Sequence, residues 1–361
     1  MYLICFFLST IFAYYFQRWH KPLGWYLLAI MPIVLLAALR SVEIGRDTHY
    51  TYDWYIYSTH YSSLKGLLSW AGKSELFVIL EFYISRWSHN FNLFLLFVHF
   101  LMYGCVIYSL YRVRKNIIIA LGLIIYLTLF YRESYNTTRQ AMAVCLCMVA
   151  FTYLIENKYI KPLAFTFVSY GFHHSSILFL GIIGMKYILT RYSRFLKTTR
   201  MKVLFIMSIA VLIYSFSEIA TFLGGVGLVD DNYIEGYTDS SHFGTNIPIS
   251  LIALNLINYI VFKNTETKTA KSDYKIFFEY ILIVSIMCCA LGFISTYTVR
   301  IGNYFWGMCP IIMAVYLSRT NTKPIISMLY LAFLFFYWFA TVVVLNLGNT
   351  YPYESISLEI F

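Results

Sequence analysis

The sequence predicts an all-α, polytopic integral membrane protein, and three observations support this fold class. Of the 361 residues, 60% are hydrophobic, and the mean hydropathy is +0.67. A soluble chain of this length cannot cover so much apolar surface. Apolar runs close to the roughly 17–25 residues that cross a bilayer recur from end to end. Only 12% of the chain is charged, and the charges fall mostly in short breaks between these runs. We therefore expect residues 1–361 to form a single transmembrane domain.

About twelve of these runs are expected to form transmembrane helices, several of them short for a helix that crosses without tilt. In chain order they cover residues 2–16, 23–39, 91–111, 116–131, 138–155, 161–172, 175–190, 203–223, 247–262, 276–295, 304–318 and 325–346. The segment 75–89 carries Glu75, Glu81 and Arg86 within apolar sequence. We expect it to be an amphipathic or re-entrant part of an outer loop over residues 40–90.

The orientation follows from the basic residues. Most of the 27 Lys and Arg residues fall in alternate short loops, and the positive-inside rule places these loops in the cytoplasm. Both termini are then outside. The net charge of +10 reflects this topology, and because the basic residues are spread over separate loops, no nucleic-acid partner is indicated.

Arginines at the outer helix ends go against this rule, so each needs a reason. They are Arg40, Arg46, Arg132, Arg139 and Arg300. One such arginine alone is explained by a side chain that reaches up to lipid phosphates. A group of them on one face favours a bound anion.

Arg139 gives the clearest case. The stretch NTTRQAMAV predicts a helix start with Asn136 as the N-cap and Arg139 in the first turn. A cation there opposes the helix dipole, whereas free amides and the guanidinium together would hold an anion. An ion pair with Glu133 is one alternative. We favour a phosphate or pyrophosphate, because a planar guanidinium pairs with two oxygens at once.

The stretch YGFHHSSILF predicts a helix break near Gly171 that places His173, His174 and Ser175 at the outer surface. Histidine titrates near neutrality and accepts a proton from a hydroxyl in general-base catalysis. Both histidines can equally be hydrogen-bonded core residues, and this alternative stays open.

One outer loop and the absence of several catalytic motifs also bear on the class of function. The outer loop over residues 224–246 is glycine-rich and acidic, and it is long for an unstructured connection. It is a candidate lid or glycan-binding loop, with a flexible connector as the alternative. The sequence has no Walker loop, no H-E-x-x-H and no G-x-S-x-G motif, so ATP-driven transport and metalloprotease chemistry are unsupported, and we expect no cofactor.

Four stretches, in chain order, resemble the EpsG-like branch of the Wzy-type polysaccharide polymerases. They are LRSVEIGRDTHYTY, NTTRQAMAV, FHHSS and VRIGNYF. The residues that match the family pattern are Arg40, Gly45, Asp47, Tyr50, Asn136, Arg139, Gln140, His173, Ser175, Arg300 and Tyr304. The chain departs from the pattern at Arg46, where the family usually has a small residue, and at His174, which follows the family histidine.

The resemblance implies a metal-independent, inverting glycosyltransferase with a C-type membrane architecture in the bacterial inner (cytoplasmic) membrane. Such an enzyme transfers a growing glycan from undecaprenyl pyrophosphate to a lipid-linked repeat unit on the periplasmic face. A chain-length regulator protein is the expected partner, together with membrane lipid.

The chemistry of this reaction gives roles to single residues. His173 and Asp47 are the candidate catalytic bases, although Asp47 can instead be a structural partner of Arg40 or Arg46. Arg139 and Arg300 are expected to hold the donor pyrophosphate, and Arg40 and Arg46 the donor or acceptor lipid head. The remaining substrate-binding candidates are Arg132, Asn136, Gln140, Tyr50, His174, Ser175 and Tyr304.

Three other classes remain open. An O-antigen ligase-like transferase shares the architecture. A lipid-linked oligosaccharide flippase would line a cavity at mid-membrane depth with its charges. A membrane O-acyltransferase would also use a buried histidine, but it needs access to an acyl donor, usually from the inside, whereas the candidate histidine here is expected outside.

Overall fold

A computed structural model describes residues 1–19, 23–71, 74–192, 198–215, 221, 246–265, 272–293, 296–318 and 324–355. Within these ranges the regular secondary structure is helical, without a strand, and one isolated antiparallel bridge joins Arg40 and Ser355. The chain forms two compact units. Unit 1 contains Met1–Ile177 and Met313–Phe361, and unit 2 contains Leu178–Ile312. Whether both units act as one transmembrane domain stays a prediction.

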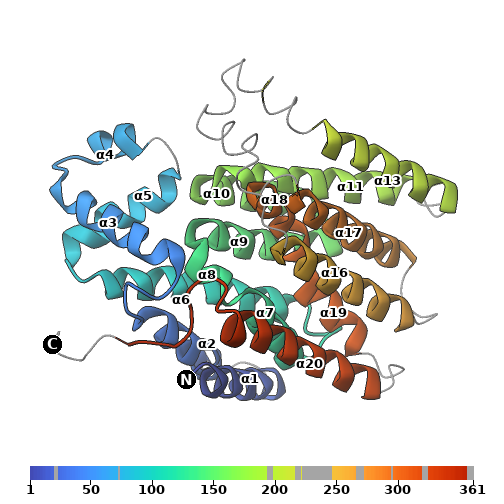
Figure 1. Cartoon of the computed structure of the whole chain (residues 1–361), viewed down its shortest axis with the longest axis horizontal. Helices are drawn as coiled ribbons and strands as arrows, with labels where there is room; N and C mark the ends of the chain where they lie inside the picture. Colours follow the sequence, from blue (N-terminus) through green and yellow to red (C-terminus); the bar gives the residue numbers. More distant parts are fainter. Residues whose placement is uncertain are drawn as a thin grey trace. The chain divides into compact units, whose positions relative to one another are not determined.

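Unit 1 is built around a bundle of apolar helices (Figure 1). Its helices before unit 2 are α1 (Tyr2–Arg18), α2 (Leu23–Ala38), α3 (Arg46–His60), α4 (Leu64–Ala71), α5 (Glu75–Trp87), α6 (Phe91–Arg112), α7 (Ile119–Phe130), α8 (Glu133–Asn136), α9 (Thr138–Ile155) and α10 (Ile160–Phe172). After unit 2 come the last part of α19 (Cys309–Leu317), then α20 (Pro324–Trp338) and its π-helical continuation η4 (Phe339–Val344). Helix α1 packs on α2, α2 on α6, α6 on α9, and α9 on α10.

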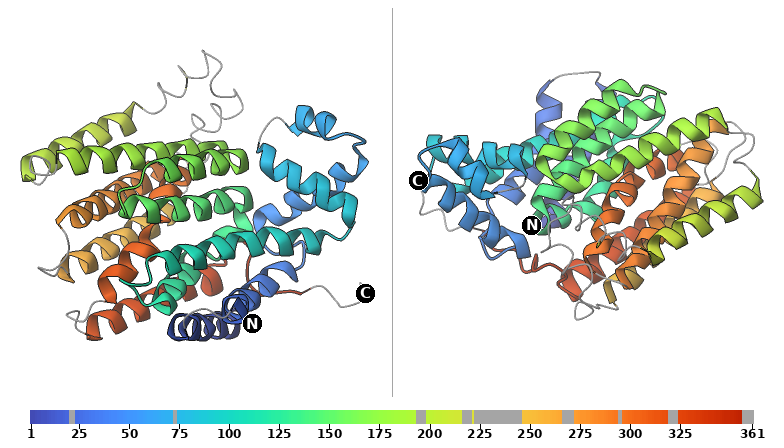
Figure 2. Two further views of the ribbon diagram at one scale, coloured as in Figure 1. Left: turned by 180° about the vertical axis from the view of Figure 1, so that it is seen from behind. Right: turned by 90° about the horizontal axis from the view of Figure 1, so that it is seen from above.

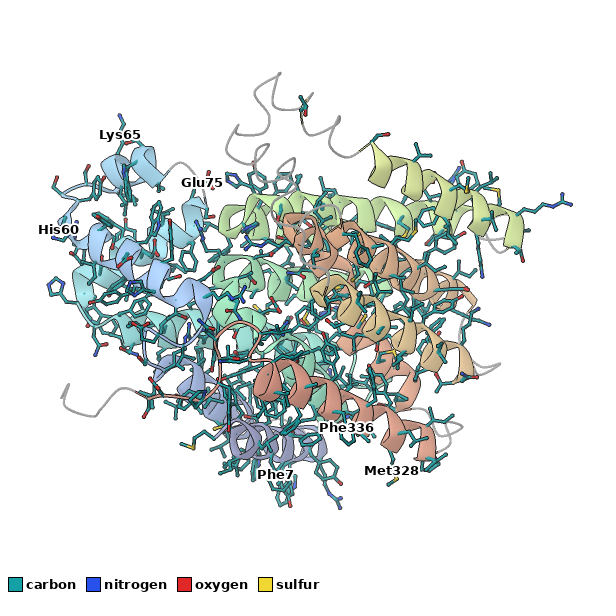
Figure 3. All side chains as sticks on the ribbon, viewed as in Figure 1. Phe7, His60, Lys65, Glu75, Met328 and Phe336 are labelled. Atoms are coloured by element: carbon teal, nitrogen blue, oxygen red, sulfur yellow. The ribbon has the colours of Figure 1, made fainter. Side chains whose placement is uncertain are left out.

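Among the residues that the structure describes, three helices are long and apolar enough to cross a membrane: α6, α9 and the continuous Pro324–Val344. Helices α2, α7 and Ile249–Asn264 of α16 are shorter and apolar. The predicted number of spans stays a prediction, although each predicted run contains a helix. Helix α9 is 94% buried over its apolar window, whereas Pro324–Val344 is 28% buried. Figure 3 shows Phe7, Met328 and Phe336 pointing outward from α1 and α20, where they are 65%, 66% and 69% exposed. Side chains of this kind suit contact with lipid tails.

The predicted outer loop over residues 40–90 is mostly helical, and its first two helices were not predicted from the sequence. Figure 2 shows α3, α4 and α5 gathered at one end of unit 1. Helix α4 turns Leu67 toward Val78 and Phe82 of α5, and these buried side chains form a small apolar cluster. The charged segment 75–89 is thus the 13-residue helix α5, and it is not among the helices that could span a membrane.

Unit 2 centres on α17 (Ser272–Ala290). The other helices that lie within it are α11 (Phe179–Arg191), α13 (Thr199–Tyr214), α16 (Asn246–Asn264), η3 (Leu291–Phe293) and α18 (Thr296–Trp306). Glu279 of α17 is buried and pairs with Lys202 and Lys263, at 2.7 and 2.8 Å, which ties three helices together. Residues 224–245 of the predicted lid lie outside the described part of the chain.

The single span predicted over residues 304–318 is wrong at its start. Helix α18 ends at Trp306, and α19 begins at Cys309 after a short turn. Pro310 has no amide hydrogen, so it fits the first turn of α19 but would interrupt a continuous helix.

Candidate functional site

Most of the candidate residues lie at one end of unit 1, where the start of α3, the single turn α8, the start of α9 and the end of α10 meet. We call this region the charged end and define it by Asp47, Asn136, Arg139 and His173. Helix α3 packs on α8, and α9 packs on α10. The charged end therefore combines three of the stretches that the sequence analysis selected.

Asn136 links two of these elements. It is the last residue of α8, and the N-cap of α9 is Thr137, so the prediction that Asn136 caps α9 is wrong. Its side-chain oxygen instead accepts a hydrogen bond of 2.8 Å from the backbone amide of Arg46, the first residue of α3. The amide of Arg46 is one of the first-turn amides that have no acceptor within the helix, and the N-cap of α3, Gly45, has no side chain to cap that turn. Asn136 thus supplies the cap from a distant part of the sequence.

Gly45 allows this close approach. It has a φ of +91°, and a Cβ atom there would lie 2.8 Å from Cβ and 2.9 Å from the carbonyl oxygen of Tyr135. A side chain at position 45 would therefore push α8 away from the start of α3.

Arg139 lies in the first turn of α9, as predicted, and is exposed. Its charge acts on Glu81 of α5, which is 3% exposed. Burial raises the pKa of the Glu81 carboxyl to about 8, and the nearby Arg139 guanidinium lowers it by a smaller amount. From the sequence, Glu81 was expected only to be a charged residue within an apolar segment. A carboxyl among Leu80, Phe82 and similar residues was the available signal.

Glu133, the alternative partner proposed for Arg139 from the sequence, pairs with Arg132. Its Oε1 accepts from Nη2 and Nε of Arg132, at 2.7 and 3.2 Å. Both side chains are largely buried, at 15% and 17% exposed. Glu133 is therefore engaged by Arg132, and the charge of Arg139 acts on the Glu81 carboxyl.

The predicted helix break is confirmed. Helix α10 ends at Phe172, His173 is extended, and a 3-10 turn covers His174–Leu178. The half-buried His173 has Nδ1 2.7 Å from Oγ of Ser175. His174 stacks on Tyr170 at 4.5 Å, and its Nε2 lies 3.2 Å from the Glu75 carboxylate. The two adjacent histidines thus have different surroundings.

The register of α9 and α10 places His173 level with Arg139. The Ser169 hydroxyl donates to the carbonyl of Ala143 at 2.9 Å, and nearer the opposite end of the pair Phe165 stacks on Tyr153. The two helices are therefore antiparallel. Arg139 and His173 are each four residues, or about 6 Å, beyond the Ser169–Ala143 contact in the same direction. Both belong to the charged end.

Arg40 is fully buried at the end of α2, beside the charged end. Its Nε donates to Thr48 Oγ1 at 3.2 Å, and its Nη1 contacts His99 Nε2 at 2.8 Å. The guanidinium lies 4.2 Å above the ring of Tyr135. Burial lowers the pKa of Arg40, although nearby tyrosines act in the opposite direction. His99, a polar residue within the apolar helix α6, was not predicted from the sequence.

The remaining candidates differ in exposure. Arg46 is exposed, Asp47 is half-buried in the first turn of α3, and Tyr50 is 70% exposed. A carboxylate in a first turn is stabilised by the helix dipole, which accounts for Asp47 without a catalytic role. Gln140 is buried in α9. In unit 2, Arg300 is exposed in the middle of α18, and Tyr304 is buried one turn later.

Comparison with known proteins gives one match. A family model described as the EpsG family matches residues 23–355. Neither a curated protein nor a solved structure matches the chain. Across the residues that the structure describes, no group of three or more His, Cys, Asp and Glu side chains is arranged to hold a metal ion.

Proposed function

Because the chain belongs to the EpsG family, a Wzy-like family of polysaccharide polymerases, we propose that it joins lipid-linked repeat units at the charged end of unit 1. The donor is a growing glycan on undecaprenyl pyrophosphate, and the acceptor is the terminal sugar of a second lipid-linked unit. The reaction takes place on the periplasmic face of the inner membrane. The observation that carries this proposal is the register that places the exposed Arg139 level with His173 at one end of the α9–α10 pair.

Arg139 is proposed to bind the donor pyrophosphate. Its guanidinium is exposed beside the first amides of α9, where a helix dipole favours an anion. The negative charge on the bridging oxygen increases as the glycosidic bond breaks, so a fixed cation stabilises the transition state more than the bound donor. Arg46 is the exposed cation at the start of α3 and is proposed to hold the second lipid head. The expectation that Arg300 of α18 also binds the donor pyrophosphate stays a prediction.

His173 is proposed to be the general base. The acceptor hydroxyl gives its proton to Nε2 of His173 while its oxygen bonds to the anomeric carbon of the donor. The bond from that carbon to the pyrophosphate oxygen breaks, and undecaprenyl pyrophosphate leaves with the bonding electrons. Attack from the side opposite the leaving group inverts the anomeric centre. Asp47 is the alternative base.

The contact with Ser175 determines whether His173 can act in this way. Nε2 accepts a proton only if the neutral ring carries its hydrogen on Nδ1. Ser175 Oγ lies 2.7 Å from Nδ1 and can accept that hydrogen. Ser175 is thus proposed to orient the ring and select the tautomer.

Arg40 is proposed to act indirectly. Its guanidinium is buried and bonds to Thr48, which lies in the first turns of α3. In this arrangement Arg40 holds the loop that presents Arg46 and Asp47.

The test uses purified protein in detergent with synthetic undecaprenyl pyrophosphate that carries one repeat unit, without nucleotide. The expected result is a glycan ladder on a gel, which the His173→Ala variant does not produce. If no ladder forms but the same lipid moves between leaflets in proteoliposomes, the protein is a flippase and the proposal is wrong.

A further inference from the structure

The last described segment of the chain, residues 345–355, lies against the loop that leads into α3. The amide of Ser41 donates to the carbonyl of Glu354 at 2.9 Å, and the amide of Gly45 donates to the carbonyl of Asn349 at 2.8 Å. Arg40 and Ser355 form the isolated bridge. We call residues 345–355 the C-terminal strap.

The strap is itself held by α1 and α2. The Tyr2 hydroxyl donates to the carbonyl of Thr350 at 2.6 Å, and the Tyr353 hydroxyl donates to the carbonyl of Leu36 at 2.9 Å. Within the strap, Oδ1 of Asn346 accepts from two successive amides. The strap is therefore fixed to the helical core. A side chain that packs against the strap is held in place by it.

Gly348 is the point where the strap meets Asn136. Its φ is +93°, and a Cβ atom there would lie 2.2 Å from Nδ2 and 2.8 Å from Cγ of Asn136. Only a residue without a side chain fits at this distance. The backbone of the strap thus packs directly against the side-chain amide of Asn136.

The hydrogen bonds of Asn136 fix which way its amide points. Nδ2 donates to the carbonyl of Arg132 at 3.1 Å, so Oδ1 faces the amide of Arg46, 2.8 Å away. A side chain with one donor and one acceptor fits this position. An alanine lacks both, and an aspartate keeps the acceptor but loses the donor.

We infer that Asn136 and Gly348 are positioning residues: the strap holds Asn136, and Asn136 holds the first amide of α3, so that Arg46 and Asp47 are presented at the charged end. The inference rests on the proposed function for its catalytic consequence. It also accounts for an asparagine at position 136, which does not cap the helix that follows it.

The structural part is tested by hydrogen exchange of the Arg46 amide in the full-length protein in nanodiscs. This amide should be protected in the wild type and exchange at least about tenfold faster in Asn136→Ala, which corresponds to the loss of one hydrogen bond. Gly348→Ala should have the same effect because it displaces the asparagine. Asn136→Asp keeps an acceptor for the amide and should restore most of the protection.

Matched control variants lie elsewhere in the chain. A Cβ atom at Gly184 would meet nothing within 4 Å, so Gly184→Ala is the control for the glycine change. Asn264 donates to the carbonyl of Ile260, as Asn136 does to that of Arg132, but it lies at the end of α16. Neither Gly184→Ala nor Asn264→Ala should change exchange at Arg46.

The catalytic part is tested by steady-state kinetics with the lipid-linked repeat unit. Asn136→Ala and Gly348→Ala should each lower kcat/KM by about 10- to 100-fold. The double variant should be no worse than Gly348→Ala alone, because both changes act through one contact. Unchanged exchange at Arg46 in Asn136→Ala, or fully additive losses in the double variant, would overturn the inference. If the wild type makes no polymer, the proposed function fails, and exchange at Arg46 still decides the positioning role.

Discussion

Nη1 of Arg40 lies 2.8 Å from Nε2 of His99 in a region of unit 1 where both side chains are fully buried. Arginine only donates hydrogen bonds, so Nε2 of His99 accepts, and the neutral ring carries its hydrogen on Nδ1. The same guanidinium also bonds to Thr48 and to the carbonyl of Ala37. A single planar group thus connects the end of α2, the start of α3 and the middle of α6.

Arg40→Lys should therefore destabilise the protein although the charge is kept. One ammonium group cannot reach Thr48, His99 and the carbonyl of Ala37 together, and buried acceptors without a donor cost about 1–3 kcal/mol each. The expected result is a lower midpoint of thermal unfolding in detergent. Arg191→Lys, at an exposed helix end, is the control. Equal unfolding midpoints for the two variants would show that the hydrogen bonds of Arg40 do not stabilise the fold.

Glu81→Gln should stabilise the protein in a pH-dependent way. The pKa of Glu81 is raised to about 8 in the folded protein, above its ordinary value of 4.5, mainly by burial. The protonated form is thus the favoured one in the fold, and the free energy of unfolding falls as the pH rises from about 4.5 through about 8. The advantage of the glutamine variant, on the order of a few kcal/mol, should grow over this interval and level off above it. Thermal unfolding of both proteins from pH 5 to pH 9 measures it. A constant difference would show that Glu81 titrates normally.

Gly45→Ala should disrupt the charged end. The added Cβ would lie 2.9 Å from the backbone oxygen of Tyr135, which cannot move without shifting α8, and the φ of +91° is strained for alanine. The expected loss is about 1–3 kcal/mol in the free energy of unfolding, together with loss of polymer synthesis. Gly181→Ala, where nothing lies within 4 Å of the added atom, should behave as the wild type. Thermal unfolding and the gel assay are measured on the same preparations.

The apolar helices were predictable because their signal is local. Runs of apolar residues identified α6, α9 and α20, and the dipeptide His173–His174 after a glycine identified the break at the end of α10. Helices α3 and α4 were missed because they lack a long apolar run. Helix α3 is polar, and α4 is stabilised by contacts of Leu67 with Val78 and Phe82, which the sequence does not display.

The contacts between candidate residues were less predictable, since they depend on partners far apart in sequence. Asn136 has the usual features of an N-cap, but Thr137 takes that position, and the asparagine oxygen bonds to Arg46, 90 residues earlier. Arg132 and Arg139 both lie within reach of Glu133 along the chain. Only the fold shows that Arg132 pairs with Glu133 and that the charge of Arg139 acts on Glu81.

Arg139→Ala should abolish polymer synthesis without lowering the amount of folded protein. The side chain is exposed in a first helical turn, where a cation is slightly unfavourable, so its removal does not weaken the fold. Arg139→Lys should also fail, because an ammonium cannot form the two parallel hydrogen bonds of a guanidinium to pyrophosphate. Arg191→Ala should keep full activity. The measurement is polymer per folded protein, and abundant polymer from either variant at position 139 would exclude this residue from the site.

Substituting each of the two adjacent histidines alone should affect activity differently. His174 forms a half-exposed pair with Glu75, and pairs of this kind contribute at most about 1 kcal/mol. His174→Ala and Glu75→Gln should therefore keep most of the activity. His173→Ala should lose it by about 100-fold or more, as expected for removal of a general base.

The Ser175→Ala variant tests whether His173 is a general base or only a packing residue. It removes the hydroxyl that lies 2.7 Å from Nδ1 of His173 while the imidazole remains. If Ser175 selects the tautomer, kcat should fall with little change in KM, and the pH dependence of kcat should shift, because the pKa of the base has changed. If the histidine only packs, Ser175→Ala should leave the pH profile of the wild type unchanged. A variant at position 174 that loses as much activity as His173→Ala would transfer the catalytic assignment from His173 to the pair.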